Sequence, residues 1–176
     1  MIGLKNVLVP TDFSHNNQAA MEYGCELARR FEAELHLLHV FEASGGLVPL
    51  PDLPADVALD LQSTSPLARA ELCLQHLPVP AWQQSLTVHR HIQLGTAASE
   101  IIRYAREHDI DLIVIGTHGY TGWEHVLLGS VAERVLQIAP CPVLTLRPQE
   151  QPETSETSAT QVAQQNGPTG KVAESS

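Results

Sequence analysis

The sequence predicts a doubly wound α/β domain, in which a five-stranded parallel sheet lies between two layers of helices. Short runs of apolar and β-branched residues alternate along the chain with stretches of helical periodicity. The connections between successive runs are long enough to contain a helix, which favours parallel pairing and right-handed crossovers. The run over residues 111–116 is almost continuously apolar, as is typical of a strand that is buried on both faces.

The first half of the chain contains two expected strands and two expected helices. A helix is predicted over residues 14–31 because its apolar residues recur three or four positions apart and so share one face. Glycine and proline are frequent in residues 44–54, which indicates a loop. The expected strands cover residues 5–10 and 34–41, and the second helix lies within residues 59–77.

The second half continues this alternation. Gly95 ends the third expected strand, and Thr96 or Ser99 caps the helix that follows. A glycine-rich loop then separates the fourth strand from the last helix. The expected elements are a strand over residues 85–94, a helix that ends at residue 108, a strand over 111–116, a helix over 130–138 and a strand over 142–147.

Composition divides the chain of 176 residues into a domain and a tail. Residues 148–176 are acidic and rich in Ser and Thr, and Val162 and Val172 are their only large apolar side chains. Such a segment cannot bury enough apolar surface to offset its chain entropy, so we expect it to be disordered. The folded domain is therefore predicted to cover residues 1–147, close to the commonest domain size.

The charge and the apolar pattern exclude several classes of partner. Lys and Arg number 10 against 20 Asp and Glu, a formal net charge of -10. Nucleic acids and anionic membranes attract clustered cations, so we expect neither as a partner. No apolar run approaches ~18 residues, the length that a membrane-spanning helix needs. With no signal-peptide pattern and only 3 scattered cysteines, we expect a cytoplasmic protein with reduced thiols.

The expected ligand site lies where several strands end, because doubly wound sheets bind ligands beyond the carboxyl ends of their strands. Gly116 and Gly119 follow a buried strand directly and allow a ligand to approach the backbone. Gly129 and Ser130 open a helix, whose unpaired N–H groups and dipole favour an anion. Ser130 also carries a hydroxyl that can donate to a phosphate oxygen or cap the helix. The pattern predicts a phosphate site with two walls.

Generic nucleotide motifs do not describe this segment. A P-loop needs Gly-Lys-Ser/Thr, which the chain lacks. The dinucleotide-binding fingerprint has a different glycine spacing and follows the first strand of its fold, whereas the glycines here follow the fourth expected strand. From the residues alone, the alternative that the glycines only shape a crossover loop stays open.

The spacing Gly116-x2-Gly119-x9-Gly129-Ser130 resembles the ATP-binding motif of the universal stress protein family. The similarity extends over residues 1–147 and includes VLVPTDFS at 7–14 and DLIVIGTHG at 111–119. It implies a Rossmann-like, three-layer α/β/α fold of the adenine nucleotide alpha hydrolase-like type. It also implies that the protein binds ATP or AMP. Many nucleotide-binding relatives carry Arg where this chain has Tyr120, and Mg²⁺ is expected to compensate for that cation.

The resemblance assigns roles to individual residues. Asp12 is expected to accept hydrogen bonds from the ribose hydroxyls, with helix capping beside Ser14 as the alternative. His118 is expected near the phosphates, with an exposed loop histidine as the alternative. The full set of expected nucleotide-binding residues is Pro10, Thr11, Asp12, Val40, Gly116, His118, Gly119, Gly129, Ser130 and Val131.

The last strand is short and is expected at an edge of the sheet, where an apolar strand invites pairing with another chain. Family members form dimers through this strand. The resemblance therefore implies a homodimer, and the alternative is that the tail covers the edge. The expected interface residues are Val143, Leu144, Thr145 and Leu146.

No catalytic or metal-ligating residue is predicted. His36 and His39 lie three apart on a strand and so point to opposite faces. His89 and His91 share a face, but no third ligand is evident beside them in the sequence. The glycine-rich loop that begins at Gly116 has no P-loop lysine, and no general base is evident near it. Their absence favours a sensor or switch over a catalyst, and the resemblance implies that it acts in the stress response. The alternatives are a slow ATPase or kinase-like enzyme, and a dimeric partner-binding protein without nucleotide.

Overall fold

A single parallel sheet organises the chain. The computed structural model describes residues 3–42, 65–117 and 128–147. Within them the strands pair in the order β3-β2-β1-β4-β5, and every pair is parallel. The predicted doubly wound α/β fold is therefore confirmed. The strands are β1 (Asn6–Pro10), β2 (Glu34–Phe41), β3 (Val88–Leu94), β4 (Leu112–Gly116) and β5 (Val143–Leu146).

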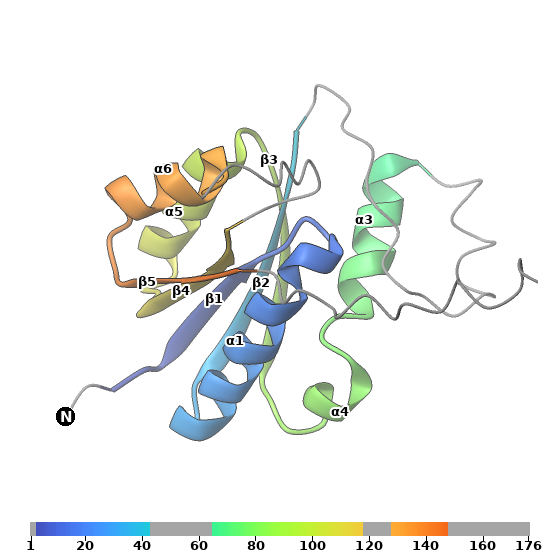
Figure 1. Cartoon of the computed structure of the whole chain (residues 1–176). Helices are drawn as coiled ribbons and strands as arrows, with labels where there is room; N and C mark the ends of the chain where they lie inside the picture. Colours follow the sequence, from blue (N-terminus) through green and yellow to red (C-terminus); the bar gives the residue numbers. More distant parts are fainter. Residues whose placement is uncertain (1–2, 43–64, 118–127, 148–176) are drawn as a thin grey trace, which may run out of the picture.

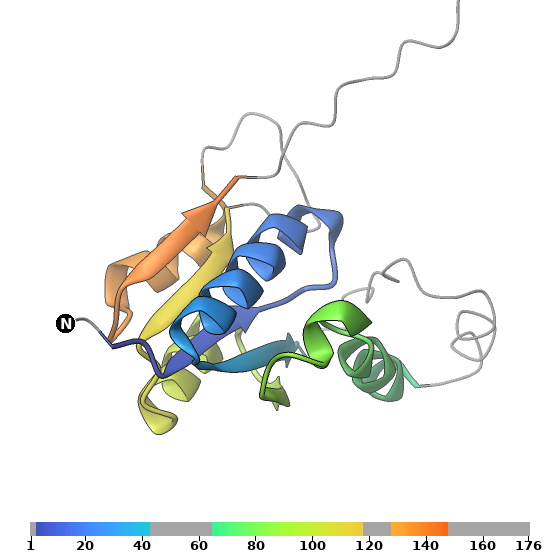
Figure 2. The same ribbon diagram turned by 90° about the horizontal axis from the view of Figure 1, so that it is seen from below.

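Helices cover both faces of the sheet, as Figures 1 and 2 show, with α1 and α3 on one face and α5 and α6 on the other. Each connection between successive strands contains at least one helix, as is usual for parallel pairing. The helical elements are the 3₁₀ helix η1 (His15–Asn17), α1 (Gln18–Phe31), α3 (Pro66–Gln75), α4 (Pro80–Gln83), α5 (Ala97–Glu107) and α6 (Ser130–Ile138).

Two element boundaries differ from the sequence prediction by several residues. The first α-helix begins at Gln18 rather than Ser14, because Ser14 is extended, with a φ of -74° and a ψ of 154°, and η1 forms before the helix. A residue in the extended region can cap a helix but cannot belong to it. The third strand begins at Val88 rather than Ser85, since the short helix α4, with Pro80 in its first turn, comes before it. The expected loop over 44–54 and the tail over 148–176 lie outside the described residues.

Alternating residues of the strands fill two separate cores. Val7 and Val9 of β1 and Leu35 and Leu37 of β2 pack with Ala20, Cys25 and Ala28 of α1. On the other face, Leu8, Leu38, Ile113 and Ile115 pack with Ile101 and Tyr104 of α5 and with Val135 of α6. The central strands are thus apolar on both faces, because each face lies under a helix layer.

Close packing between α1 and β1 depends on Gly24. A Cβ atom at this position would lie 2.3 Å from Cγ2 of Val9, and Val9 is fully buried. The absence of a side chain lets the helix approach the strand, and this is the reason for a glycine in the middle of a helix.

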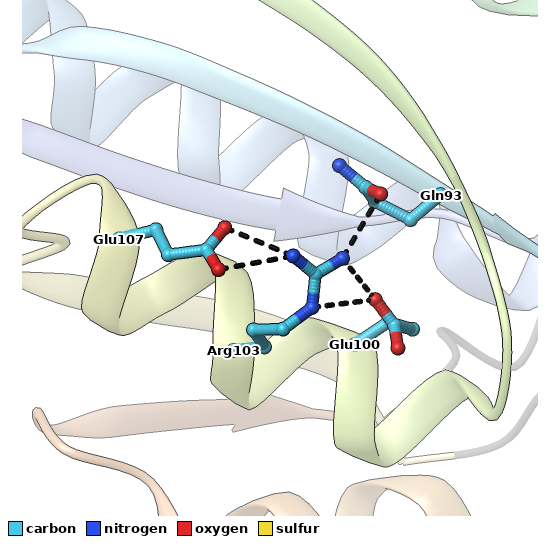
Figure 3. A network of polar contacts seen from close by, with 4 residues as sticks. All are labelled: Gln93, Glu100, Arg103 and Glu107. Carbon is cyan, nitrogen blue, oxygen red and sulfur yellow. Dashed lines mark hydrogen bonds and ion pairs between the residues drawn. The ribbon is translucent and has the colours of Figure 1, made fainter.

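Polar contacts attach α5 to the edge strand β3. Figure 3 shows that Arg103 of α5 donates to Oε1 of Gln93 on β3 at 3.0 Å. The same guanidinium donates to Glu107 at 3.0 and 3.1 Å and is paired with Glu100. These side chains lie at the surface, so the network orients the helix more than it stabilises the fold.

Among the residues that the structure describes, no helix is both long enough and apolar enough to cross a membrane.

Candidate nucleotide site

The described part of the chain contains a pocket beside the point where the strand order reverses, between β1 and β4. Its volume is about 190 Å³, whereas a single water needs roughly 10–15 Å³. The pocket therefore has room for a small molecule. Doubly wound sheets bind ligands at this place because adjacent connections leave the sheet in opposite directions there. It is lined by Pro10, Thr11, Asp12, Asn17, Leu38, His39, Val40, Ala97, Ile101, Ile115, Gly116, Thr117, Gly129, Ser130, Val131 and Ala132.

The end of β1 forms the floor of this pocket. The amide of Thr11 continues the sheet and donates to the carbonyl of Leu38 at 2.9 Å. Asn17, which precedes α1, donates through Nδ2 to the carbonyl of Pro10 at 2.9 Å. This bond anchors the start of α1 to the strand end, so the backbone at the floor is fixed in place.

The side chain of Asp12 also lines the pocket. Its Oδ1 accepts hydrogen bonds from the amide of Ser14 at 3.0 Å and from the Ser14 hydroxyl at 2.6 Å. Asp12 thus bonds the backbone two residues further on, as in an Asx turn, whereas Ser14 is the N-cap residue of η1. The carboxylate is oriented by the protein and lies at the pocket at the same time.

His39 is a pocket residue that the sequence did not indicate. It is 7% exposed, and its Nδ1 lies 2.9 Å from the carbonyl oxygen of Thr11. Because a carbonyl only accepts, Nδ1 carries the proton. Burial lowers the pKa of His39, although the Thr11 carbonyl and the charge of Asp12 oppose this shift. The ring also packs on Phe13, with a centroid distance of 4.4 Å. A neutral imidazole therefore supports the end of β1.

The opposite wall is built by the end of β4 and the start of α6. The amide of Thr117 donates to the carbonyl of Leu146 at 2.8 Å, and the amide of Gly129 donates to the carbonyl of Thr117 at 2.6 Å. The second bond joins the strand end directly to the residue that precedes α6. The N–H group of Gly129 is therefore occupied within the protein.

The amides that follow Gly129 have no intrahelical acceptor. Gly129 is the N-cap of α6, and no side chain among the described residues caps this helix. The N–H groups of Ser130, Val131 and Ala132 occupy the first turn, which has no preceding carbonyls to bond. All three residues line the pocket. A helix start of this kind favours an anion through its N–H groups and its dipole.

Gly129 has a φ of -68° and a ψ of 152°, an extended conformation that any residue adopts. The backbone conformation therefore does not explain why position 129 is a glycine.

The structure brings most of the expected site residues together. Pro10, Thr11, Asp12, Val40, Gly116, Gly129, Ser130 and Val131 all line the pocket. His118, Gly119 and Tyr120 lie outside the described residues. Sequence reasoning missed Asn17, Leu38, His39, Ala97, Ile101, Ile115, Thr117 and Ala132. Thr117 and Ala132 adjoin the motif and could have been found, whereas Ala97 and Ile101 reach the pocket only because α5 packs across β2.

A doubly wound α/β domain with a ligand pocket at its switch point is the class of protein that these observations define. The model of the universal stress protein family matches residues 3–147. A universal stress protein of Methanocaldococcus jannaschii is 35% identical over 143 residues, which cover 81% of this chain and 82% of that protein. The chain belongs to the universal stress protein family.

Solved structures agree with this assignment. A universal stress protein from Lactobacillus plantarum is 29% identical with a TM-score of 0.58, covering 82% of this chain and 98% of that one. A universal stress protein solved in complex with cAMP has a TM-score of 0.62 at 19% identity, over 84% and 99% of the two chains. Another, from Archaeoglobus fulgidus in complex with dAMP, has a TM-score of 0.56 at 20% identity, over 84% and 100%. The last two share the fold.

Proposed function

We propose that the protein binds an adenine nucleotide, ATP or AMP, in this pocket and acts as a sensor or switch in the stress response. The observation that carries the proposal is the start of α6. There, the uncapped first-turn amides of Ser130, Val131 and Ala132 lie at a pocket formed by three strand ends. Backbone amides at a helix start are suited to phosphate oxygens.

The remaining lining divides into parts that suit a nucleotide. Val40, Ile101 and Ile115 provide apolar surface of the kind on which a base packs. Asp12 is the carboxylate of the described lining, and a carboxylate accepts hydrogen bonds from ribose hydroxyls. Apolar groups for the base, an acceptor for the sugar and donors for the phosphates thus surround one pocket.

The charge of the lining favours binding over catalysis. Among the described lining residues there is no Lys or Arg, so the groups that meet the phosphates there are backbone amides. Phosphoryl transfer needs positioned cations and an oriented nucleophile. Mg²⁺ would arrive with ATP and be held mainly by phosphate oxygens and water. Asp12 is the one carboxylate of the described lining, and it already accepts a hydrogen bond from Ser14.

Relatives support the choice of ligand class. The two solved family members described above were crystallised with cAMP and with dAMP, both of them adenine nucleotides. Their identity to this chain is low, so they indicate which ligands to test first.

The experiment isolates the backbone amide of Ser130 from its hydroxyl. Ser130→Ala removes the hydroxyl, and Ser130→Pro removes both the hydroxyl and the amide hydrogen. Proline is tolerated at the first position of a helix, and Gly129 already has the extended conformation that proline requires of the residue before it. Both variants should therefore keep the fold, which circular dichroism checks.

Calorimetry with ATP and AMP, with and without Mg²⁺, then measures binding. A hydrogen bond to a charged group contributes about 1.5–3 kcal/mol, so Ser130→Pro should bind at least about tenfold more weakly than Ser130→Ala. Native mass spectrometry of the untreated protein should also show a retained adenine nucleotide. Equal affinities in the two variants, or no binding by the wild type, would contradict the proposal.

The proposal includes a homodimer through β5. This strand pairs only with β4 and ends the described sheet, so one of its edges has no strand beside it there. Val143, Leu144, Thr145 and Leu146 are each partly exposed. An apolar edge strand of this kind is suited to pairing with a second copy.

A further inference from the structure

A second group of chemically active side chains lies outside the pocket lining, where β2 and β3 meet under α5. His36 of β2 stands directly opposite His89 of β3, and Leu38 stands opposite His91. His108, which follows α5, approaches the same place, with its ring centroid 5.8 Å from that of His36 and 5.4 Å from that of His91. We call His36, His89, His91 and His108 the histidine cluster.

His36 is the buried member of the histidine cluster. Its residue is 6% exposed, and its Nδ1 lies 2.9 Å from the hydroxyl of Tyr104 on α5. The other ring nitrogen, Nε2, is buried and has no hydrogen-bond partner in the described structure. Buried polar atoms are almost always paired, so an unpaired imidazole nitrogen calls for an explanation.

Two further residues beside His36 offer ligand atoms. Nε2 of His89 is 2.6 Å from Oε2 of Glu34, the first residue of β2. Glu34, His36 and His89 each offer one ligand atom, and these three atoms all lie within 4.8 Å of one another. One carboxylate and two imidazoles are a donor set that suits zinc and related transition metals and not Mg²⁺ or Ca²⁺.

We propose that Glu34, His36 and His89 form a binding site for a divalent transition metal of the zinc type. The metal takes the lone pairs of His36 Nε2 and His89 Nε2. The proton that Nε2 of His89 shares with Glu34 moves through solvent to Nδ1 of the same ring, so His89 stays a neutral imidazole and Glu34 binds the metal as a carboxylate. Tyr104 accepts a hydrogen bond from Nδ1–H of His36, which fixes the ring so that Nε2 is the metal-binding nitrogen.

Binding requires a small local movement. Ligands at about 2.0–2.1 Å from a tetrahedral zinc are roughly 3.3 Å apart, so the three atoms must draw together. The rings of His36 and His89 are stacked, with centroids 4.7 Å apart and planes 27° from parallel. Because a metal lies in the plane of each ring that binds it, His89 has to turn. It is free to do so, since its side chain is 40% exposed on the edge strand.

The metal site shares no residue with the described lining of the proposed nucleotide pocket. Glu34 and His36 belong to the start of β2, whereas the pocket is lined by Leu38, His39 and Val40 near its end. Metal binding can therefore be measured without nucleotide, and its result does not depend on the proposed function.

The test is calorimetry of Zn²⁺ binding to the full chain, treated with chelator and free of nucleotide, at pH 7.5. The wild type should bind one Zn²⁺ per chain. His89→Ala and Glu34→Gln should each lower the affinity at least tenfold and should keep the fold, because both side chains are about half exposed. His76→Ala is the matched control, since His76 caps the end of α3 on the opposite face of the sheet.

A second measurement identifies the ligands. Co²⁺ in the same site should give the visible absorption of a tetrahedral ion, and His89→Ala should abolish it. Lowering the pH to 5.5 should weaken Zn²⁺ binding, because the metal then competes with protons for the imidazoles. The proposal fails if the wild type binds no Zn²⁺, or if His89→Ala, Glu34→Gln and His76→Ala all bind it as the wild type does.

Discussion

Asp12 holds Ser14 through a single oxygen. Oδ1 of Asp12 accepts from the Ser14 amide at 3.0 Å and from the Ser14 hydroxyl at 2.6 Å. Between them lies Phe13, whose φ of 63° turns the chain from β1 towards α1. A side chain that bonds the backbone two residues further on stabilises a turn of this kind. The structure thus shows Asp12 supporting the local turn, and ribose binding by the same carboxylate stays a prediction.

Substitution by asparagine separates the two roles of Asp12. Asn keeps an oxygen that accepts from Ser14 but loses the negative charge, whereas Ala loses both. If the carboxylate binds the ribose, Asp12→Asn should be as stable as the wild type within about 0.5 kcal/mol. It should nevertheless bind ATP about tenfold more weakly, because a hydrogen bond to a charged group is lost. Urea denaturation and calorimetry measure the two quantities.

Ser14→Ala is the control for this series. It removes the hydroxyl contact with Asp12 and leaves the carboxylate in place, so nucleotide affinity should change little. An Asp12→Asn variant with wild-type affinity would assign Asp12 to the turn alone.

Patterns that are local in the sequence predicted most of the fold. The apolar run of β4 and the glycine and serine before α6 each indicated an element from neighbouring residues, and the pocket follows from where those elements end. His39 could not be found in this way, because its role depends on the Thr11 carbonyl and the Phe13 ring, 28 and 26 positions away. The pairing of His36 with His89 likewise depends on the register of β2 against β3.

The start of α1 was mispredicted for a physical reason. Helical periodicity from Ser14 onwards suggested a continuous helix, but periodicity does not show that Ser14 is extended and that the 3₁₀ helix η1 comes before α1. The positive φ of Phe13, a buried aromatic residue that packs against His39, also gave no sign in the sequence pattern.

Gly24→Ala should destabilise the protein although alanine favours helices. The new Cβ would lie 2.3 Å from Cγ2 of Val9, a stiff and fully buried side chain, so α1 or β1 has to move. We expect a loss of about 1–3 kcal/mol in the free energy of unfolding, measured with urea. At Gly3, a Cβ has nothing within 4 Å, so Gly3→Ala should leave the stability within about 0.5 kcal/mol of the wild type. Equal stabilities for the two variants would contradict the packing argument.

The stability should fall as the pH is lowered from 6.5 towards 4. Burial, and next the charges of His89 and His108, lower the pKa of His36 from 6.5 to about 4. Burial lowers the pKa values of His39 and His91 as well. Because the unfolded chain takes up these protons first, the contribution is fully present above pH 6.5 and is lost on acidification. Each such histidine lowers the free energy of unfolding by at most about 1.4 kcal/mol for each unit by which the pH falls.

His36→Asn tests this dependence, since asparagine does not titrate and its amide can still donate to Tyr104. Urea denaturation at pH 7, 6 and 5 should give a shallower fall in stability than in the wild type. Carboxylates titrate in both proteins and their contribution cancels in the comparison. The same slope in both proteins would show that His36 does not carry the dependence.

Thr145→Pro should separate the proposed dimer into monomers. The carbonyls of Pro142 and Leu146 accept from Ile113 N at 3.0 Å and from Thr117 N at 2.8 Å, so both face β4. Alternate residues of a parallel strand turn their backbone groups to the same neighbour, and Val143 and Thr145 therefore present theirs to the outer edge. Proline is tolerated at an edge position whose N–H points away from the sheet.

Sedimentation velocity at micromolar concentration should show a dimer for the wild type and for Thr145→Ala, which keeps the amide, and a monomer for Thr145→Pro. A wild type that remains monomeric at high micromolar concentration would contradict the dimer. A dimer that survives in Thr145→Pro would instead place the contact between copies away from this edge, because a pairing of edge strands cannot lose a central donor without weakening.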